Sequence, residues 1–266
     1  MKFGIVGYGK MSSAIARAAK GYFEKKETQL YVYTPSAMSA KQAREDLGHV
    51  RICEDMEELC RESNLILFGV KPQILLNLLN KYAEQLKGKA VLSIAAGITS
   101  RSIFQAVGEM VEVQRIMPNL GALVSRGMTL LSEETTLSDL SLEYVQELFA
   151  TIGKVKVLPE SLMDIGSVIS GSSGAFYTLF LEGLAEAGLR RGLSYQDAID
   201  MALQSHLGAI LQLQEGLDSG KLRIETSSPA GTTIEGVIAL EKAGLRSALH
   251  EAVEASFRRC VELSKQ

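Results

Sequence analysis

Residues 1–23 constrain the fold of this chain more than any other stretch. An apolar run from Lys2 to Val6 has the character of a strand, the turn Gly7-Tyr8-Gly9 follows it, and apolar residues at helical spacing continue from Ala14 to Phe23. In such a unit the first glycine permits the tight turn, and the second lets a pyrophosphate approach the backbone at the helix N-terminus. Ser12 stands in place of a third glycine and is small enough for the helix to pack closely on the strand. The stretch therefore predicts the first unit of a dinucleotide-binding fold.

Alternating apolar runs and helical stretches extend this unit into an α/β domain. Further strands are predicted at 30–33, 50–53, 65–70, 90–94, 111–116, 127–131 and 155–158, and helices at 55–62, 73–87 and 138–150. Alternation of strands with helices is typical of a parallel, doubly wound sheet.

The end of the second predicted strand bears on which dinucleotide the fold binds. Folds that prefer NAD usually carry an Asp or Glu there, which binds the ribose 2′-hydroxyl. This strand ends instead in Thr34-Pro35-Ser36, and Lys41 and Arg44 follow on the next helix. Hydroxyl groups and nearby cations suit a 2′-phosphate, so the sequence favours NADP over NAD. Lys41 and Arg44 are equally typical of the solvated face of a helix.

Two later strand ends are candidates to line the nicotinamide half of the cofactor. Gly69-Val70-Lys71-Pro72 closes one strand and Ala95-Ala96-Gly97 closes the next. Ligands of doubly wound sheets lie outside the carboxyl ends of the strands, where both segments are expected. An ordinary surface lysine explains Lys71 equally well.

The chain changes character after about residue 160. No strand-like run remains, and apolar stripes at helical spacing run from Phe176 to Ala187 and from Leu245 to Ser256. A helical half this apolar is expected to pack against a second subunit. We therefore predict an N-terminal Rossmann domain over residues 1–159 and a C-terminal, all-helical dimerisation and substrate domain over residues 160–266.

A late string, Ser227-Ser228-Pro229-Ala230-Gly231-Thr232-Thr233, predicts an anion site. Ser228 is a good N-cap, and Pro229 suits the first helical position because its missing donor would be unpaired there. The amides of Ala230 and Gly231 would then be free at the positive end of a helix. An ordinary capped helix explains the same string.

Composition and charge exclude several classes of function. The net charge of −3 gives no electrostatic footprint for nucleic acid or an anionic membrane. Cys53, Cys60 and Cys260 form no CxxC pair, which fits small buried side chains in a reducing cytosol. No apolar run approaches the ~20 residues of a membrane span and no signal peptide is indicated, so we expect a cytoplasmic protein. No metal-ligand spacing or nucleophile elbow occurs, which disfavours a metal site and hydrolase chemistry.

Several of these motifs occur in the order of one enzyme family. The chain resembles the pyrroline-5-carboxylate reductases over nearly its whole length, in the segments Gly7-Tyr8-Gly9-Lys10-Met11, Val70-Lys71-Pro72-Gln73, Ala95-Ala96-Gly97, Met117-Pro118-Asn119, Ser170-Gly171-Ser172, Ser228-Pro229-Ala230-Gly231-Thr232-Thr233 and Ala239-Leu240-Glu241. The resemblance implies a Rossmann domain, a helical domain that forms a homodimer or an oligomer of dimers, and reduction of 1-pyrroline-5-carboxylate to L-proline with NAD(P)H, the last step of proline biosynthesis.

The resemblance also implies roles for individual residues. Cofactor contacts are expected from Val6, Gly7, Tyr8, Gly9, Lys10 and Met11 at the pyrophosphate, from Thr34 and Ser36 at the 2′-phosphate, and from Val70, Lys71, Pro72, Ala95 and Ala96 beside the nicotinamide. The substrate carboxylate is expected on Ser228, Gly231, Thr232 and Thr233. The expected catalytic residues are Thr233, which would hydrogen-bond the imine nitrogen, and Glu160, which would orient the ring nitrogen. A protonated imine is already electrophilic, so neither a nucleophile nor a metal is expected.

The chain departs from the family pattern at four places. The family usually has Gly-Pro at Ser173-Gly174, Thr-Pro at Leu120-Gly121, glycine at Ala230, and Asn or Gln at Glu225. The first three lie near the expected substrate or nicotinamide site, so they leave substrate identity and turnover open. Two alternatives therefore stand beside the main interpretation: a paralogue that binds dinucleotide without reducing anything, and a reductase acting on another imine or a small hydroxy acid.

Overall fold

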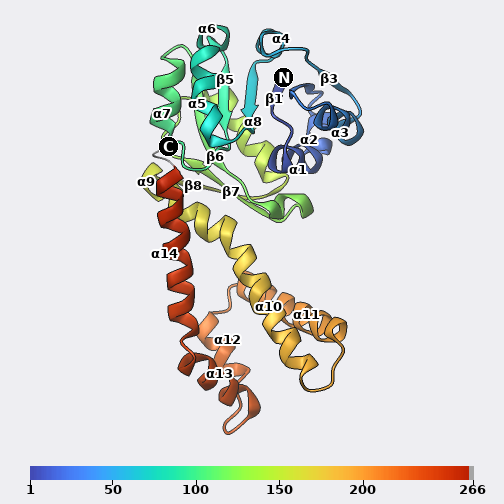
Figure 1. Cartoon of the computed structure of the whole chain (residues 1–266), viewed down its shortest axis with the longest axis vertical. Helices are drawn as coiled ribbons and strands as arrows, with labels where there is room; N and C mark the ends of the chain where they lie inside the picture. Colours follow the sequence, from blue (N-terminus) through green and yellow to red (C-terminus); the bar gives the residue numbers. More distant parts are fainter. Residues whose placement is uncertain (264–266) are drawn as a thin grey trace. The chain divides into compact units, whose positions relative to one another are not determined.

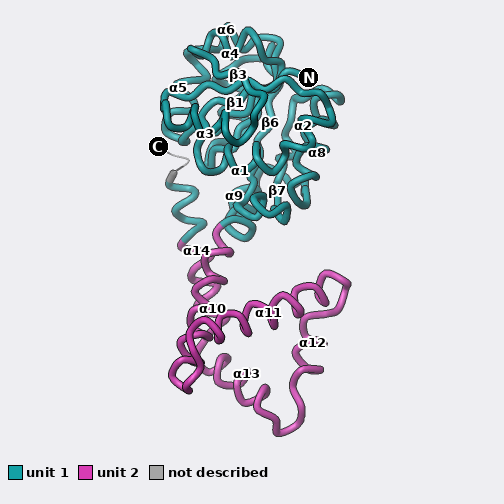
Figure 2. The backbone as a smooth tube through the Cα atoms, turned by 90° about the vertical axis from the view of Figure 1, so that its right-hand side faces the viewer, with its two compact units in different colours: residues 1–171, 256–266 teal, residues 172–255 magenta. Residues whose placement is uncertain are grey.

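The computed structural model describes residues 1–263, which divide into two compact units (Figure 2). Unit 1 comprises residues 1–171 and the described end of the chain from residue 256, and unit 2 comprises residues 172–255. The boundary predicted at residue 160 falls earlier than this division. Residues 160–171 stay with unit 1 because α9 (Glu160–Ser167) packs on the sheet through Met163, which contacts Met117 and Leu130.

Unit 1 is built on one eight-stranded sheet with the order β3-β2-β1-β4-β5-β6-β7-β8. The strands are β1 (Lys2–Val6), β2 (Gln29–Tyr33), β3 (Val50–Ile52), β4 (Leu65–Phe68), β5 (Ala90–Ser93), β6 (Glu112–Met117), β7 (Gly127–Ser132) and β8 (Gly153–Leu158). Every predicted strand is present, and the order of the first six is that of the Rossmann fold. The predicted α/β class is confirmed.

One strand pair differs from the predicted parallel arrangement, since β6 and β7 are antiparallel. The segment between them is short and contains only the 3-10 turn η1 (Leu120–Val124). A parallel pair needs a crossover of a dozen residues or more, whereas an antiparallel pair closes with a short connection. The short connection therefore sets the direction of β7.

Helices cover both faces of the sheet, and each face has its own apolar core (Figure 1). On one face lie α1 (Lys10–Ala18), α2 (Lys20–Lys25), α3 (Ala37–Leu47) and α8 (Asp139–Ala150). On the other face lie α4 (Met56–Glu62), α5 (Pro72–Lys81), α6 (Ala83–Leu86) and α7 (Ser100–Val107). Burial on both faces explains why the central strands are nearly continuous apolar runs. The single helices predicted at 14–23 and 73–87 each occur as two, interrupted at Ala19 and Tyr82.

Unit 2 contains only helices among its described residues. The π-helix η2 (Val168–Ser172), most of which belongs to unit 1, leads into α10 (Ser173–Leu189). The chain continues through α11 (Tyr195–Gln214), α12 (Ser219–Glu225), α13 (Thr232–Lys242) and the first part of α14 (Leu245–Leu263). The helices α10 and α11 pack closely where Gly188 faces Ala198, since a Cβ on Gly188 would lie 2.9 Å from the Ala198 side chain. Many other apolar side chains of this unit are exposed, among them Leu179, Met201, Leu207, Ile210 and Leu211. The unit therefore has little core of its own.

Candidate active site

The loops after β1, β2, β4 and β5 lie along one edge of the sheet. In the strand register Val6 pairs with both Tyr33 and Phe68, and β4 ends beside β5. The amide of Gly7 donates to the Tyr33 carbonyl at 2.8 Å, and the amide of Gly69 donates to the Val6 carbonyl at 2.9 Å. The strand order reverses between β1 and β4, so this edge is the switch point at which doubly wound sheets bind their ligands.

The glycine turn after β1 has the geometry of a phosphate cradle. Gly7 has a φ of 82°, which favours glycine, and a Cβ there would lie 3.0 Å from the Gly69 carbonyl and from the Val70 side chain. Gly9 is the N-cap of α1, and a Cβ on it would meet no protein atom within 4 Å. The space beside Gly9, at the positive end of this helix, is therefore open. This arrangement fits a pyrophosphate.

Tyr8, predicted to contact the cofactor, has its ring buried beneath this turn. Its hydroxyl donates to the Asp46 carboxylate at 3.0 Å, and Arg17 lies 3.9 Å from the same group. Burial and then the nearby Asp46 charge raise the pKa of Tyr8 well above its ordinary value. The side chain fastens the turn to α3, so Tyr8 offers a ligand its backbone.

The loop after β2 places hydroxyls at the same edge. Ser36 is the N-cap of α3 and accepts a hydrogen bond from the Ser39 amide at 3.3 Å. Lys41 is largely exposed and lies 3.7 Å from Glu45 on the outer face of α3. The ion pair favours the solvated-face interpretation of Lys41, and Thr34 and Ser36 stay the predicted contacts for a 2′-phosphate.

The loop after β4 ends in a helix start with proline in the first turn, the arrangement that the sequence predicted at Ser228 and Pro229. Lys71 is the N-cap of α5, with extended backbone, and Pro72 occupies the first turn. The Lys71 side chain is exposed, and no acidic residue in the described part of the chain pairs with it. Its ammonium is therefore available to a ligand at the edge of the sheet.

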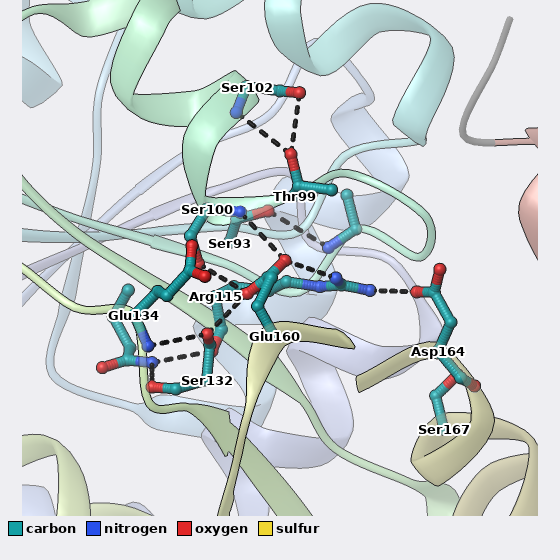
Figure 3. A network of polar contacts seen from close by, with 12 residues as sticks. Ser93, Thr99, Ser100, Ser102, Arg115, Ser132, Glu134, Glu160, Asp164 and Ser167 are labelled. Atoms are coloured by element: carbon teal, nitrogen blue, oxygen red, sulfur yellow. Dashed lines mark hydrogen bonds and ion pairs between the residues drawn. The ribbon is translucent and has the colours of Figure 1, made fainter. Parts of the chain in front are cut away.

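The loop after β5 ends in a polar network that centres on Glu160 (Figure 3). The Glu160 carboxylate accepts from the Ser100 amide at 3.2 Å, the Ser100 hydroxyl at 2.9 Å and Arg115 at 2.7 Å, and it also accepts from Ser132. The second terminal nitrogen of the Arg115 guanidinium, Nη2, pairs with Asp164. The network joins α7, β6, β7 and α9.

The charges in this network stabilise one another. Burial by itself would raise the pKa of Glu160, but hydrogen bonds from Ser132 and Arg115 outweigh it and hold the pKa below its ordinary value. Burial would lower the pKa of Arg115, and the two carboxylates outweigh it and raise that pKa. The Arg115 side chain is only 1% exposed, so its charge depends on these partners.

The predicted helix start at Ser228 and Pro229 is wrong. The segment is a turn in which the Gly231 amide donates to the Ser228 carbonyl at 3.0 Å, and α13 begins at Thr232 with Gly231 as N-cap. A Cβ on Gly231 would lie 2.1 Å from the Ser228 hydroxyl and 3.0 Å from the Ser228 carbonyl oxygen, so a side chain at this position would require that hydroxyl to rotate away. The Gly231 amide is occupied by the turn, and the free amides are instead those of the first turn of α13.

The hydroxyls of this segment remain open. Ser228, Thr232 and Thr233 are exposed, and within residues 1–263 their hydroxyls have no hydrogen-bond partner. The segment lies in unit 2, whereas the loops at the sheet edge lie in unit 1.

Sequence reasoning missed Arg115, Asp164, Ser100 and Ser132. An arginine between the apolar residues Val113 and Ile116 of a predicted strand was the available signal, since a charge in a central strand requires a buried partner. At the departure Leu120-Gly121, a Cβ on Gly121 would lie 2.8 Å from the Arg126 carbonyl, so this glycine permits a close approach of the backbone.

The cysteines, possible metal ligands and long helices have weaker support as functional sites. The three cysteines are free and buried as predicted, and burial raises the pKa of Cys53 and Cys60 to about 11. Among residues 1–263 no group of three or more His, Cys, Asp or Glu residues could hold a metal ion. In the same range no helix combines the length and apolar character needed to cross a membrane.

Comparison with known proteins agrees with this arrangement. Residues 2–97 match the family model described as NADP oxidoreductase coenzyme F420-dependent, and residues 160–263 match the model for pyrroline-5-carboxylate reductase dimerisation. A curated pyrroline-5-carboxylate reductase from Methanosarcina acetivorans is 33% identical, covering 100% of this chain and 98% of its own. The chain belongs to the pyrroline-5-carboxylate reductase family. The Escherichia coli pyrroline-5-carboxylate reductase is 32% identical over 99% of this chain and 98% of its own.

Solved structures of the pyrroline-5-carboxylate reductase family share the fold. The Plasmodium falciparum pyrroline carboxylate reductase, crystallised with NADP bound, has 27% sequence identity and a TM-score of 0.87, covering 99% of this chain and 98% of its own. The predicted family and two-part architecture are thereby confirmed.

Proposed function

We propose that this protein reduces 1-pyrroline-5-carboxylate to L-proline with NADPH. The observation that carries the proposal is the full-length match to pyrroline-5-carboxylate reductases. The loops after β1, β2 and β4 support it independently. They lie together at the switch point of the sheet, where folds of this type bind a dinucleotide.

The cofactor site extends along the four loops of unit 1. The turn Val6–Met11 binds the pyrophosphate through backbone amides, Thr34 and Ser36 bind the 2′-phosphate, and Val70, Lys71, Pro72, Ala95 and Ala96 line the nicotinamide side. When bound, NADPH supplies the hydride. The Thr34 and Ser36 hydroxyls, with no acidic residue at the end of β2, suit a phosphate better than they suit a free 2′-hydroxyl, which supports NADPH over NADH.

The substrate site is the start of α13. The free amides of Thr232 and Thr233 and the Ser228 hydroxyl bind the substrate carboxylate at the positive end of the helix. Gly231 lets the backbone turn closely against Ser228. The Thr233 hydroxyl hydrogen-bonds the imine nitrogen or the amine that forms from it.

These residues act by binding and orientation. A protonated imine is electrophilic without covalent activation, so holding carbon 5 in line for reduction supplies most of the acceleration. No nucleophile or metal is required.

The helical half supports a homodimer. Many apolar side chains of unit 2 are exposed in the single chain, and residues 160–263 match a dimerisation family. We assign cofactor binding to residues 1–159 and dimerisation with substrate binding to residues 160–266. We place the protein in the cytoplasm, which agrees with three buried, free thiols.

This function is tested by the loss of NADPH absorbance in the presence of 1-pyrroline-5-carboxylate. The same assay is run in parallel with NADH and with a panel of other cyclic imines. We expect oxidation that depends on the imine and is faster with NADPH. Oxidation with a different imine alone would reassign the substrate. NADPH binding without any oxidation would favour a binding-only paralogue and contradict the proposal.

A further inference from the structure

We propose that Arg115 and Glu160 are positioning residues that hold the loop Ala95–Ile98 in place, and that Glu160 does not contact the substrate. The loop connects β5 to α7 at the edge of the sheet. The inference rests on the proposed function, because that function places Ala95 and Ala96 beside the nicotinamide.

The Glu160 carboxylate has no acceptor position left for a substrate. A carboxylate offers about four lone-pair sites. One oxygen accepts from the Ser100 amide and from Arg115, and the other accepts from the hydroxyls of Ser100 and Ser132. A hydrogen bond to a ring nitrogen would therefore have to displace one of these donors.

Glu160 also caps the start of α7, although it lies in α9. Thr99 is the N-cap of this helix and its hydroxyl accepts from the Ser102 amide at 3.1 Å, which leaves the Ser100 amide without a local partner. Glu160 supplies that partner at 3.2 Å and also accepts from the Ser100 hydroxyl at 2.9 Å. The end of the loop is thereby fixed to α9.

The start of the loop follows the strand position that lies opposite Arg115. Ser93 pairs with Arg115 in the strand register, and the Ser93 hydroxyl accepts from the Ala95 amide at 3.3 Å. Ala96 packs on the apolar cluster that contains Met163 of α9. The loop therefore contacts α9 at Ala96 and at Ser100, and Arg115 acts on it through its ion pair with Glu160.

The first test measures the loop itself and needs neither cofactor nor turnover. In Glu160→Gln we expect the amides of residues 95–102 to exchange hydrogen roughly tenfold faster than in the wild type, because the shared carboxylate is lost. Asp164→Asn is the matched control, since Asp164 pairs with Arg115 but has no contact with Ser100. Unchanged exchange in Glu160→Gln, or the same acceleration in Asp164→Asn, would overturn the proposal.

The second test separates positioning from substrate binding. In Glu160→Gln we expect kcat to fall about 10–100-fold, because small misplacements near reacting atoms are costly. The KM for the imine and the Kd for NADPH should stay within ~3-fold, and Arg115→Lys should retain part of kcat. The kinetic isotope effect with NADPH deuterated at the transferred position should rise in Glu160→Gln and stay at the wild-type value in Asp164→Asn.

A raised KM with an unchanged kcat would instead place Glu160 on the substrate. An inactive wild type would refute the proposed function alone, because the exchange measurement still decides whether the pair holds the loop.

Discussion

Ala230 occupies a backbone conformation that an alanine rarely adopts. Its φ of 56° is in the left-handed region, directly after Pro229 in the turn closed by the hydrogen bond from Gly231 to Ser228. Proline at the second position and a left-handed residue at the third is the pattern of a type II turn, which normally takes glycine there. The family's usual glycine at this position therefore has a physical reason, and Ala230 is strained.

Replacing Ala230 by glycine should relieve this strain. We expect Ala230→Gly to raise the free energy of unfolding by about 1 kcal/mol, measured by denaturant titration. Ala243→Gly is the matched control, because Ala243 has a φ of −74° and should lose about 0.5–1 kcal/mol on the same change. A loss of stability in Ala230→Gly would show that the left-handed turn is not the one formed in solution.

At the scale of elements, the ion pairs of Arg115 connect β6 to α9. Arg115 is 1% exposed and meets Glu160 at the start of α9 and Asp164 one turn later. Removing one partner of a buried pair leaves an uncompensated charge, so the connection stabilises unit 1 only while both carboxylates are ionised.

This connection predicts an acid-sensitive contribution to stability. The pKa of Glu160 is held below its ordinary value of 4.5, so its contribution is present above that value and is lost as the pH falls through the lowered pKa. The difference in unfolding free energy between wild type and Glu160→Gln should therefore be largest near neutral pH and shrink in acid. Unfolding titrations of both proteins across pH measure it, and a difference that stays constant would contradict the ionised pair.

Sequence patterns were sufficient for the elements that are buried on both sides and insufficient for those set by contacts distant in the chain. The central strands β1, β4 and β5 were predictable because their apolar runs are nearly continuous. The direction of β7 depends on its short connection to β6, and the partners of Arg115 lie far along the chain at Glu160 and Asp164. The Ser228 string satisfies the rules for a helix start and for a turn, so the string by itself could not separate them.

At the scale of the whole molecule, the exposed apolar side chains of unit 2 fit the match of residues 160–263 to a dimerisation family. Leu179 of α10 is 71% exposed, and Met201 and Leu207 of α11 are also exposed. Burying one leucine is worth ~1.5–3 kcal/mol, so a charge at such a position should break a dimer that depends on it.

Leu179→Asp should weaken self-association by roughly tenfold or more in sedimentation experiments. Leu140→Asp is the control, because Leu140 of α8 in unit 1 is equally exposed, at 71%. Leu140→Asp should sediment as the wild type does. Equal behaviour of both variants, or a wild type that is monomeric, would contradict dimerisation through the helical unit.

The proposed reaction is tested most directly by the amount of L-proline formed per NADPH consumed when the purified protein is given 1-pyrroline-5-carboxylate. We expect one L-proline for each NADPH oxidised, with the reaction strongly slowed in Thr233→Val while NADPH binding stays normal. NADPH binding without formation of L-proline, or oxidation that yields another product, would contradict the proposed reaction.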